Sequence, residues 1–139
     1  PTISAGMFVA EKAKESGYYP PIIVPKALEI GPRLLNTFTT AYKFGIKIAF
    51  GTDSGVSYHG DNAKEFVYMV EGGMLEIEAI KSATVVPAQL LNISEKLGTV
   101  ESNKIADIIA VDGDPTQDIR SMLKVVFVMK NGKVYKTPS

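Results

Sequence analysis

The sequence predicts an α/β fold for its first part, followed by a tail made mostly of β-strands. Apolar residues recur three or four positions apart between residues 25 and 44, which is typical of an amphipathic helix. Residues 46–50 (Ile-Lys-Ile-Ala-Phe) form a short, mostly apolar run, as expected for a strand covered on both faces. Near the end of the chain, Asn131 and Gly132 separate two strand-like runs, which is the best short signal for a β-hairpin.

The N-terminal part is expected to begin with two helices. Ser4 is a suitable N-cap for a helix over residues 4–15, with Gly17 just after its end. The two tyrosines and two prolines of residues 18–21 suit a loop rather than a helix or a central strand. The second helix covers residues 25–44. Pro32 is expected to kink or restart this helix, because Gly31 loosens the chain just before it.

The strand at residues 46–50 is expected to lead into a loop over residues 51–60. Asn62 and Glu65 have the spacing of a capping box, which predicts the start of a helix that runs to about Glu71. The glycine pair at residues 72 and 73 is expected to end that helix. A helix over about residues 75–84 follows, and a short third helix is expected to have Pro87 at its first position.

The C-terminal part is expected to contain three strands, over residues 105–111, 125–130 and 133–136. Residues 112–115 (Asp-Gly-Asp-Pro) predict a turn after the first strand. Asn131 and Gly132 predict a type I′ turn between the other two strands, because both central residues of that turn need a positive φ. Asp107, near the start of the first strand, is expected to hydrogen-bond to the backbone rather than to take part in catalysis.

Composition and charge exclude several classes of function. Hydrophobic residues make up 45% of the 139 residues and charged residues 22%, which is typical of a folded domain. Lys plus Arg number 15 and Asp plus Glu number 15, so charge gives no reason to expect a nucleic acid or an anionic membrane as partner. The sequence has no Cys, which excludes disulfides, zinc fingers and a thiol nucleophile. No apolar stretch reaches the ~18 residues of a membrane span.

The candidate for chemistry is Asp53, which comes after the expected strand and has Gly51 and Gly55 on either side. A carboxylate at the C-terminal end of a buried strand is in a favoured functional position, because active sites of strand–helix barrels lie at that end. The flanking glycines let a ligand or a metal approach the backbone closely. Asp53 could therefore be a metal ligand, a general base or a phosphate acceptor. The alternative is that Asp53 only caps the following turn.

Two other chemistries fit the same segment poorly. The Asp-Ser-Gly run at residues 53–55 also surrounds the nucleophile of chymotrypsin-like proteases, but that mechanism needs a His base and a separate Asp. His59 is the only His in the chain, and it lies in the same short loop. A phosphorylated receiver-type Asp would need further acidic residues upstream to hold Mg²⁺. The acidic residues upstream of Asp53 (Glu11, Glu15 and Glu29) are all in expected helices.

A series of short motifs runs in order through nearly the whole chain. They are Pro1-Thr2-Ile3, Gly51-Thr52-Asp53-Ser54-Gly55, His59-Gly60, Asn62-Ala63, Glu65-Phe66, Glu71-Gly72-Gly73-Met74, Ala79-Ile80-Lys81-Ser82-Ala83-Thr84, Pro87-Ala88-Gln89-Leu90-Leu91, Leu97-Gly98-Thr99-Val100, residues 104–115 and residues 128–134. With these motifs the sequence resembles the C-terminal end of the amidohydrolase superfamily. The most similar branch is the imidazolonepropionase-like group, which includes Xaa-Pro dipeptidases.

The resemblance implies a (β/α)8 barrel joined to a small β-sandwich that is built from both ends of the chain. On that basis residues 1–96 belong to the C-terminal portion of the barrel and residues 97–139 to strands of the composite sandwich. The resemblance also implies one or two divalent metal ions, usually zinc. It assigns Asp53 as the metal ligand at the end of strand eight, which takes a proton from the attacking water. A metal lowers the pKa of its bound water towards ~7, so a neighbouring carboxylate can accept that proton.

The sequence also departs from the family pattern. The family's other metal ligands are a His-x-His pair, a carbamylated Lys or a Glu, and two further His residues, and one His cannot supply them. A full barrel takes roughly 250 residues, more than this chain contains. We therefore expect the chain, which begins at Pro1 rather than Met, to be the C-terminal part of a longer enzyme.

The expected function is that of a metal-dependent amidohydrolase acting on an Xaa-Pro dipeptide, an N-acyl amino acid or a cyclic amide. The alternative is an inert fragment or an assembly module. Ser54 and His59 are candidate substrate-binding residues, although an exposed loop His needs no such role. Zinc or another divalent metal is expected in the intact parent and not tightly on this chain alone. We expect a cytoplasmic protein that associates with copies of itself or with the missing N-terminal part, without nucleic-acid or membrane partners.

Overall fold

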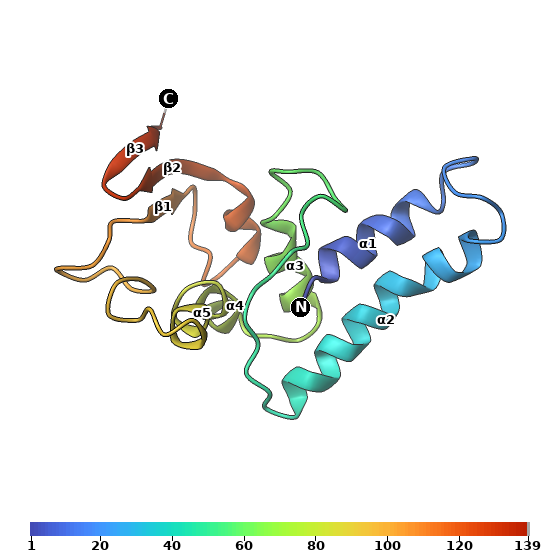
Figure 1. The fold of residues 1–139 in the computed structure, drawn as a ribbon, viewed down its shortest axis with the longest axis horizontal. Coiled ribbons are helices and arrows are strands. Elements are labelled where there is room, and N and C mark those ends of the chain that lie inside the picture. Colours follow the sequence, from blue (N-terminus) through green and yellow to red (C-terminus); the bar gives the residue numbers. More distant parts are fainter. Residues whose placement is uncertain (139) are drawn as a thin grey trace.

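The computed structural model describes residues 1–138 as five α-helices, a short 3₁₀ helix and a three-stranded sheet (Figure 1). In chain order these are α1 (Ile3–Lys12), α2 (Val24–Lys43), α3 (Lys64–Glu71), α4 (Glu76–Ser82), α5 (Val85–Leu90), β1 (Ile108–Val111), η1 (Ile119–Leu123), β2 (Val125–Lys130) and β3 (Lys133–Lys136). The α1–α2 hairpin forms one end of the molecule and the sheet forms the other, with α3 to α5 between them.

The α1–α2 hairpin is packed closely at a pair of glycines. A Cβ atom added to Gly31 would lie 2.8 Å from the Met7 Sδ and 3.0 Å from the Gly6 carbonyl oxygen. A Cβ added to Gly6 would lie 2.5 Å from a Leu34 methyl carbon. Only glycine fits at these two positions without a shift of the neighbouring atoms, so the pair sets the distance between the helices.

Helix α2 does not restart at Pro32, so the restart is ruled out, whereas a kink there stays a prediction. The helix runs without interruption from Val24 to Lys43 with Pro32 inside it. A proline removes one backbone N–H and crowds the preceding turn, which weakens a helix without requiring it to end. Gly31, the residue before Pro32, lies against Gly6 and Met7 of α1.

Three predicted helix starts are also wrong. Ser4 does not cap α1, because the helix already begins at Ile3 and Ser4 is buried within its first turn. Asn62 and Glu65 do not form a capping box on α3, which has no side-chain cap. Helix α5 begins at Val85, two residues before Pro87, so the proline lies inside the first turn, where its missing N–H costs little.

Residues 46–50 are not assigned as a strand, contrary to the prediction. A strand requires a hydrogen-bonded neighbour. Among the described residues the only backbone bonds made by this segment are from the Ile46 amide to the Ala41 carbonyl oxygen and from the Phe50 amide to the Ser82 carbonyl oxygen (2.8 Å). The segment is also only partly buried, since Ile46 and Lys47 are exposed and Ile48, Ala49 and Phe50 are half-buried, and the residues of 1–138 supply no strand beside it.

The C-terminal sheet has the order β1–β2–β3, and both pairs are antiparallel. The predicted hairpin between β2 and β3 is confirmed, since Asn131 (φ 50°) and Gly132 (φ 75°) both have positive φ. The Asp107 carboxylate accepts a 2.7 Å hydrogen bond from the Asn131 amide and pairs with Lys130, which confirms its structural role. The 3₁₀ helix η1, which the sequence analysis did not predict, begins after Asp118, whose side chain accepts from the Arg120 amide.

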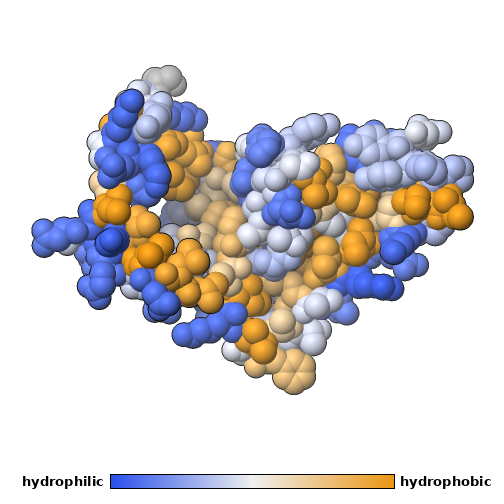
Figure 2. All heavy atoms as spheres, in the orientation of Figure 1, coloured by the Kyte–Doolittle hydropathy of each residue, from blue (hydrophilic) through white to orange (hydrophobic). Residues whose placement is uncertain are grey.

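The core lies around α3 and draws on every helix except α5. Its buried members are Ile3, Phe38, Phe66, Met69, Met74, Ala79, Ile119 and Met122. Apolar side chains also gather at the surface over α5 and the C-terminal end of α2, along the lower edge of Figure 2. The exposed fractions there are 81% for Phe44, 58% for Ile46, 69% for Leu90 and 64% for Leu91. No helix in the described part of the chain is both long and apolar enough to cross a membrane.

Candidate functional site

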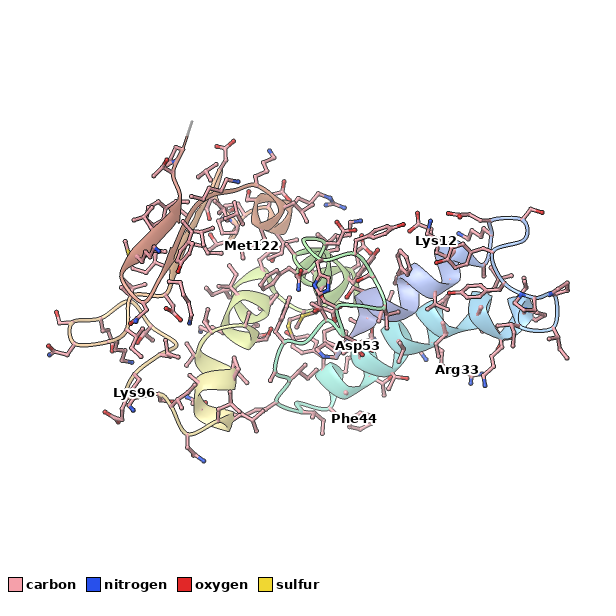
Figure 3. All side chains as sticks on the ribbon, turned by 45° about the horizontal axis from the view of Figure 1, so that its top comes forward. Lys12, Arg33, Phe44, Asp53, Lys96 and Met122 are labelled. Carbon is pink, nitrogen blue, oxygen red and sulfur yellow. The ribbon has the colours of Figure 1, made fainter. Side chains whose placement is uncertain are left out.

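Asp53 lies in an exposed loop after the extended segment, beside the N-terminal end of α1 (Figure 3). Its backbone is in the left-handed region with φ at 54°, where non-glycine residues are uncommon and Asp is among the better tolerated. The Asp53 carbonyl oxygen accepts a 3.2 Å hydrogen bond from the Val56 amide, which closes a tight turn. Its carboxylate has no hydrogen bond to any residue in 1–138. The Asp53 side chain is thus exposed, and the neighbouring residues keep its backbone in the left-handed conformation.

The residues before Asp53 are fixed by the first turn of α1. The Thr2 amide donates a 2.9 Å hydrogen bond to the Gly51 carbonyl oxygen. The Ser4 hydroxyl donates a longer one, 3.4 Å, to the carbonyl oxygen of Thr52. Thr2 also has a positive φ, 61°, which is unusual for a β-branched residue. The start of α1 and the segment that ends at Asp53 are therefore joined through main-chain atoms.

The residues after Asp53 are fixed by a small network of polar side chains. The Ser54 hydroxyl lies 2.9 Å from the Thr52 hydroxyl and accepts a 2.8 Å hydrogen bond from the Asn62 side-chain amide. The Asn62 side-chain oxygen in turn accepts from the Gly60 amide at 3.1 Å. The Ser54 hydroxyl thus already has two partners within the loop, and Asn62 closes the loop across its base.

Glu65 joins α3 to the start of α1. Its side chain is fully buried, with 0% exposure. One carboxylate oxygen accepts a 2.9 Å hydrogen bond from the Ile3 amide and the other accepts a 2.7 Å bond from the Ser4 amide. A helix leaves its first amides without intrahelical partners and has a partial positive charge there, so a carboxylate is a favourable acceptor. Glu65 therefore caps α1 from a distant part of the chain.

His59 is exposed near the end of the same loop, and its neighbour Tyr58 connects the loop to α1. The Tyr58 ring packs edge-on against Phe8 with the ring centroids 5.4 Å apart. Under the loop, the hydrogen bond between Lys64 and Asp61 (2.8 Å) raises the pKa of Lys64. Burial raises the pKa of Tyr68 on the next turn of α3. These contacts hold the loop against α1 and α3.

The described residues do not assemble a complete metal site. No group of three or more His, Cys, Asp or Glu side chains in residues 1–138 is arranged to hold a metal ion. Asp53 offers a single carboxylate donor, and catalytic zinc needs about three protein ligands besides its water. Asp53 fits the chemistry of one ligand, and the remaining ligands would have to come from other residues.

Four polar residues around Asp53 were not recognised as site residues from the sequence: Thr2, Ser4, Asn62 and Glu65. The spacing of Asn62 and Glu65 did indicate a capping box. That signal reports only that both side chains can accept from backbone amides, and it does not say which helix they cap. The fold decides that Asn62 holds Ser54 and Glu65 holds α1.

Comparison with known proteins gives both a family and solved relatives. The model of the amidohydrolase family matches residues 3–135. A crystal structure of a Xaa-Pro dipeptidase with methionine bound in its active site is 55% identical, with a TM-score of 0.91 over 98% of this chain. A prolidase complexed with N-methylphosphonate-L-proline is 28% identical, with a TM-score of 0.80 over 99% of this chain. Ochratoxinase from A. niger is 28% identical, with a TM-score of 0.74 over 99% of this chain.

The match covers only part of each solved protein. The chain spans 34% of the Xaa-Pro dipeptidase, 34% of the prolidase and 31% of the ochratoxinase. None of the curated proteins compared with the chain matches it.

Proposed function

The chain belongs to the amidohydrolase family, and we propose that it supplies the C-terminal part of a metal-dependent hydrolase of amide-type C–N bonds. The match to the family model over residues 3–135 supports a hydrolase as the parent. The chain accounts for about a third of the length of its solved relatives, so the activity belongs to the parent enzyme. Residues 1–96 would complete a (β/α)8 barrel, and residues 97–139, the last of which lies outside the described part, would add strands to a β-sandwich.

The substrate we propose is an Xaa-Pro dipeptide. The relative with 55% identity is a Xaa-Pro dipeptidase, and a second relative binds an N-substituted proline. N-acyl amino acids and cyclic amides present the same C–N bond and are the substrates to be tested beside it. The three classes differ in the group attached to the scissile nitrogen, so one enzyme is expected to favour one of them strongly.

Asp53 is the residue on which this proposal depends. The observation that supports it is an exposed carboxylate without a hydrogen-bond partner among residues 1–138, held in a left-handed backbone conformation between fixed neighbours. A strained backbone that its surroundings maintain is typical of functional positions. The simple alternative, a turn cap, would give the carboxylate a nearby amide partner. We propose that Asp53 is a metal ligand and accepts a proton from the attacking water.

A divalent metal, zinc or another, would supply the activation of that water by lowering its pKa. Asp53 would be both the one metal ligand that this chain contributes and the group that accepts the proton. Ser54 and His59 remain candidates for substrate contact. The Ser54 hydroxyl is engaged with Thr52 and Asn62, so its contribution would be to the shape of the loop, whereas His59 is exposed and free to reach a ligand.

The second candidate is that the chain alone is catalytically inert and acts only through association. The observation that favours it is the lack of a three-ligand group in the described residues. The exposed apolar side chains over α5 and the end of α2 would then contact the N-terminal part of the parent or another copy. Light scattering of the purified chain at high concentration tests this, because a monodisperse monomer would argue against such contacts.

The function is tested by assaying the intact parent with Met-Pro, N-acetylmethionine and hydantoin, before and after removal of metal with a chelator. We expect hydrolysis of Met-Pro that is lost on chelation and restored by added zinc or another divalent cation. Activity that survives exhaustive chelation would contradict the metal-dependent mechanism. Hydrolysis of one of the other two compounds alone would keep the family chemistry and overturn the dipeptide assignment.

A further inference from the structure

The buried carboxylate of Glu65 has no role in the proposed chemistry, yet its burial costs the folded state free energy. A charged side chain is costly to bury, and this one has 0% exposure. The N-terminus of α1 could be capped from its own sequence by a single Ser, Thr or Asp at low cost. The chain instead uses a carboxylate 61 and 62 residues away to bind two consecutive amides of α1. Local helix capping alone does not explain that arrangement.

The contacts continue from α1 to the residues that precede Asp53. Glu65 holds the amides of Ile3 and Ser4, and those residues lie next to Thr2. The Thr2 amide binds the Gly51 carbonyl oxygen, and the Ser4 hydroxyl binds the Thr52 carbonyl oxygen. The firmer of these two links is the 2.9 Å bond from Thr2, and the Ser4 link is longer at 3.4 Å, so a change at Glu65 reaches the residue before Asp53 mainly through Thr2, Gly51 and the peptide bond to Thr52.

The same helix region holds the residue after Asp53. Asn62, just before α3, donates to the Ser54 hydroxyl at 2.8 Å. Asp53, with a φ of 54°, thus lies between two neighbours that are both tied to the start of α3, one directly and one through α1. Because a non-glycine residue does not hold a positive φ by itself, its carboxylate direction depends on these ties.

We infer that Glu65 is a positioning residue for Asp53, which it holds in its productive orientation through the first turn of α1. The catalytic part of this inference rests on the proposed function of Asp53. Glu65 contacts neither substrate nor metal in this mechanism. Displacing a catalytic group by about 1 Å can lower a rate by about 10²-fold, so a positioning residue has a measurable effect on turnover.

The test uses the Glu65→Gln variant of the intact protein. A side-chain amide has one acceptor oxygen, so one of the two α1 amides would face an NH₂ group and lose its bond. Glu71→Gln is the matched charge control, because Glu71 is on the same helix but partly exposed. Met122→Ala is the stability control, because Met122 is a buried core residue on η1, and in the described part of the chain η1 makes no hydrogen bond to residues 51–60. Ser4→Ala keeps the Glu65 bond and removes only the hydroxyl link to Thr52.

Two measurements are made on each variant. The first is the exchange rate of the Thr2 and Val56 amides, which bind the Gly51 and Asp53 carbonyl oxygens. We expect about tenfold faster exchange of both in Glu65→Gln, since a buried hydrogen bond is lost, and no change in Glu71→Gln. The second measurement is steady-state kinetics. We expect kcat to fall about 10- to 100-fold in Glu65→Gln with KM nearly constant, and kcat to stay at the wild-type value in Met122→Ala.

The outcomes separate the inference from the function on which it rests. Faster exchange at Ile3 and Ser4 with unchanged Val56 exchange and kcat would reduce Glu65 to a helix cap and overturn the inference. If Glu65→Gln does not fold, Glu65→Asp decides, because it keeps the charge but shortens the side chain that reaches the Ile3 and Ser4 amides, and normal Val56 exchange with normal kcat in that variant would overturn the inference. If the wild-type protein hydrolyses none of the compounds, the proposed function fails, while the exchange data still decide whether Glu65 orders the Asp53 loop.

Discussion

Gly31 on α2 meets Gly6 on α1 so closely that a Cβ atom on Gly31 would stand 3.0 Å from the Gly6 carbonyl oxygen. This contact lies in the helical hairpin whose first turn also holds the segment leading to Asp53. The position of α1 is thus set by two constraints. Close packing of Gly6 against Gly31 fixes the distance of α1 from α2, and the Glu65 carboxylate binds the N-terminus of α1.

Gly31→Ala is expected to lower the stability of the protein by about 1–3 kcal/mol, the usual cost of overpacking. Helix propensity alone predicts the opposite, because alanine is about 1 kcal/mol better than glycine in a helix interior. Asn36→Ala, at an exposed position of the same helix, is the control and is expected to be neutral or slightly stabilising. Chemical denaturation measures both variants. A Gly31→Ala protein as stable as wild type would show that α1 and α2 can separate freely.

Asp107 gives the structure a defined sensitivity to acid. Its ion pair with Lys130, together with the hydrogen bond from the Asn131 amide, lowers the pKa of Asp107. A carboxyl group whose pKa is lower in the folded state stabilises the fold above its unfolded pKa, and that stabilisation disappears as the pH falls through the folded pKa. We therefore expect Asp107→Asn to lower stability at neutral pH and to have a diminishing effect below about pH 4.

Unfolding midpoints measured between neutral pH and about pH 2 test this expectation. Asp112→Asn, at an exposed position in the turn after β1, is the comparison variant. Equal loss of stability at every pH in Asp107→Asn would show that the contribution of Asp107 is one of shape and not of charge.

Part of the fold could be predicted from the sequence because it depends on neighbours in the chain. The β2–β3 hairpin is one example, since Asn131 and Gly132 by themselves favour positive φ. Asp53 was found in the same way, from a glycine-flanked carboxylate after an apolar run. The features that the sequence did not reveal depend on distant partners. Glu65 has the same local context whether it caps α3 or α1, and tertiary packing decides between them.

The extended segment at residues 46–50 is a case in which the local sequence pattern gave the wrong prediction. Its composition is that of a buried strand, and the prediction of a strand is wrong for residues 1–138 because pairing is a property of two segments. Pro32 is similar, because the sequence shows the lost amide but not the neighbouring helix α1, against which the residue before Pro32 packs.

A chain of residues 1–139 on its own is expected to bind zinc weakly and to lack hydrolase activity. Catalytic zinc takes about three protein ligands, and the described residues bring no such group together around Asp53. Metal analysis after dialysis and an assay with Met-Pro provide the measurements. A purified chain that retains one zinc per molecule and turns over the dipeptide would require a ligand set that we have not identified.

The central claim is that Asp53 accepts the proton of the attacking water, and the most direct test is the kcat of Asp53→Asn in the intact parent. Asparagine keeps the shape, tolerates the same positive φ and still offers an oxygen to a metal, so the free energy of unfolding should change by less than ~1 kcal/mol. Loss of a general base lowers the rate by about 10²–10⁴-fold, and we predict a fall of that size. A folded Asp53→Asn enzyme that retains more than about a tenth of the wild-type kcat would contradict the general-base role and leave Asp53 as a structural turn residue.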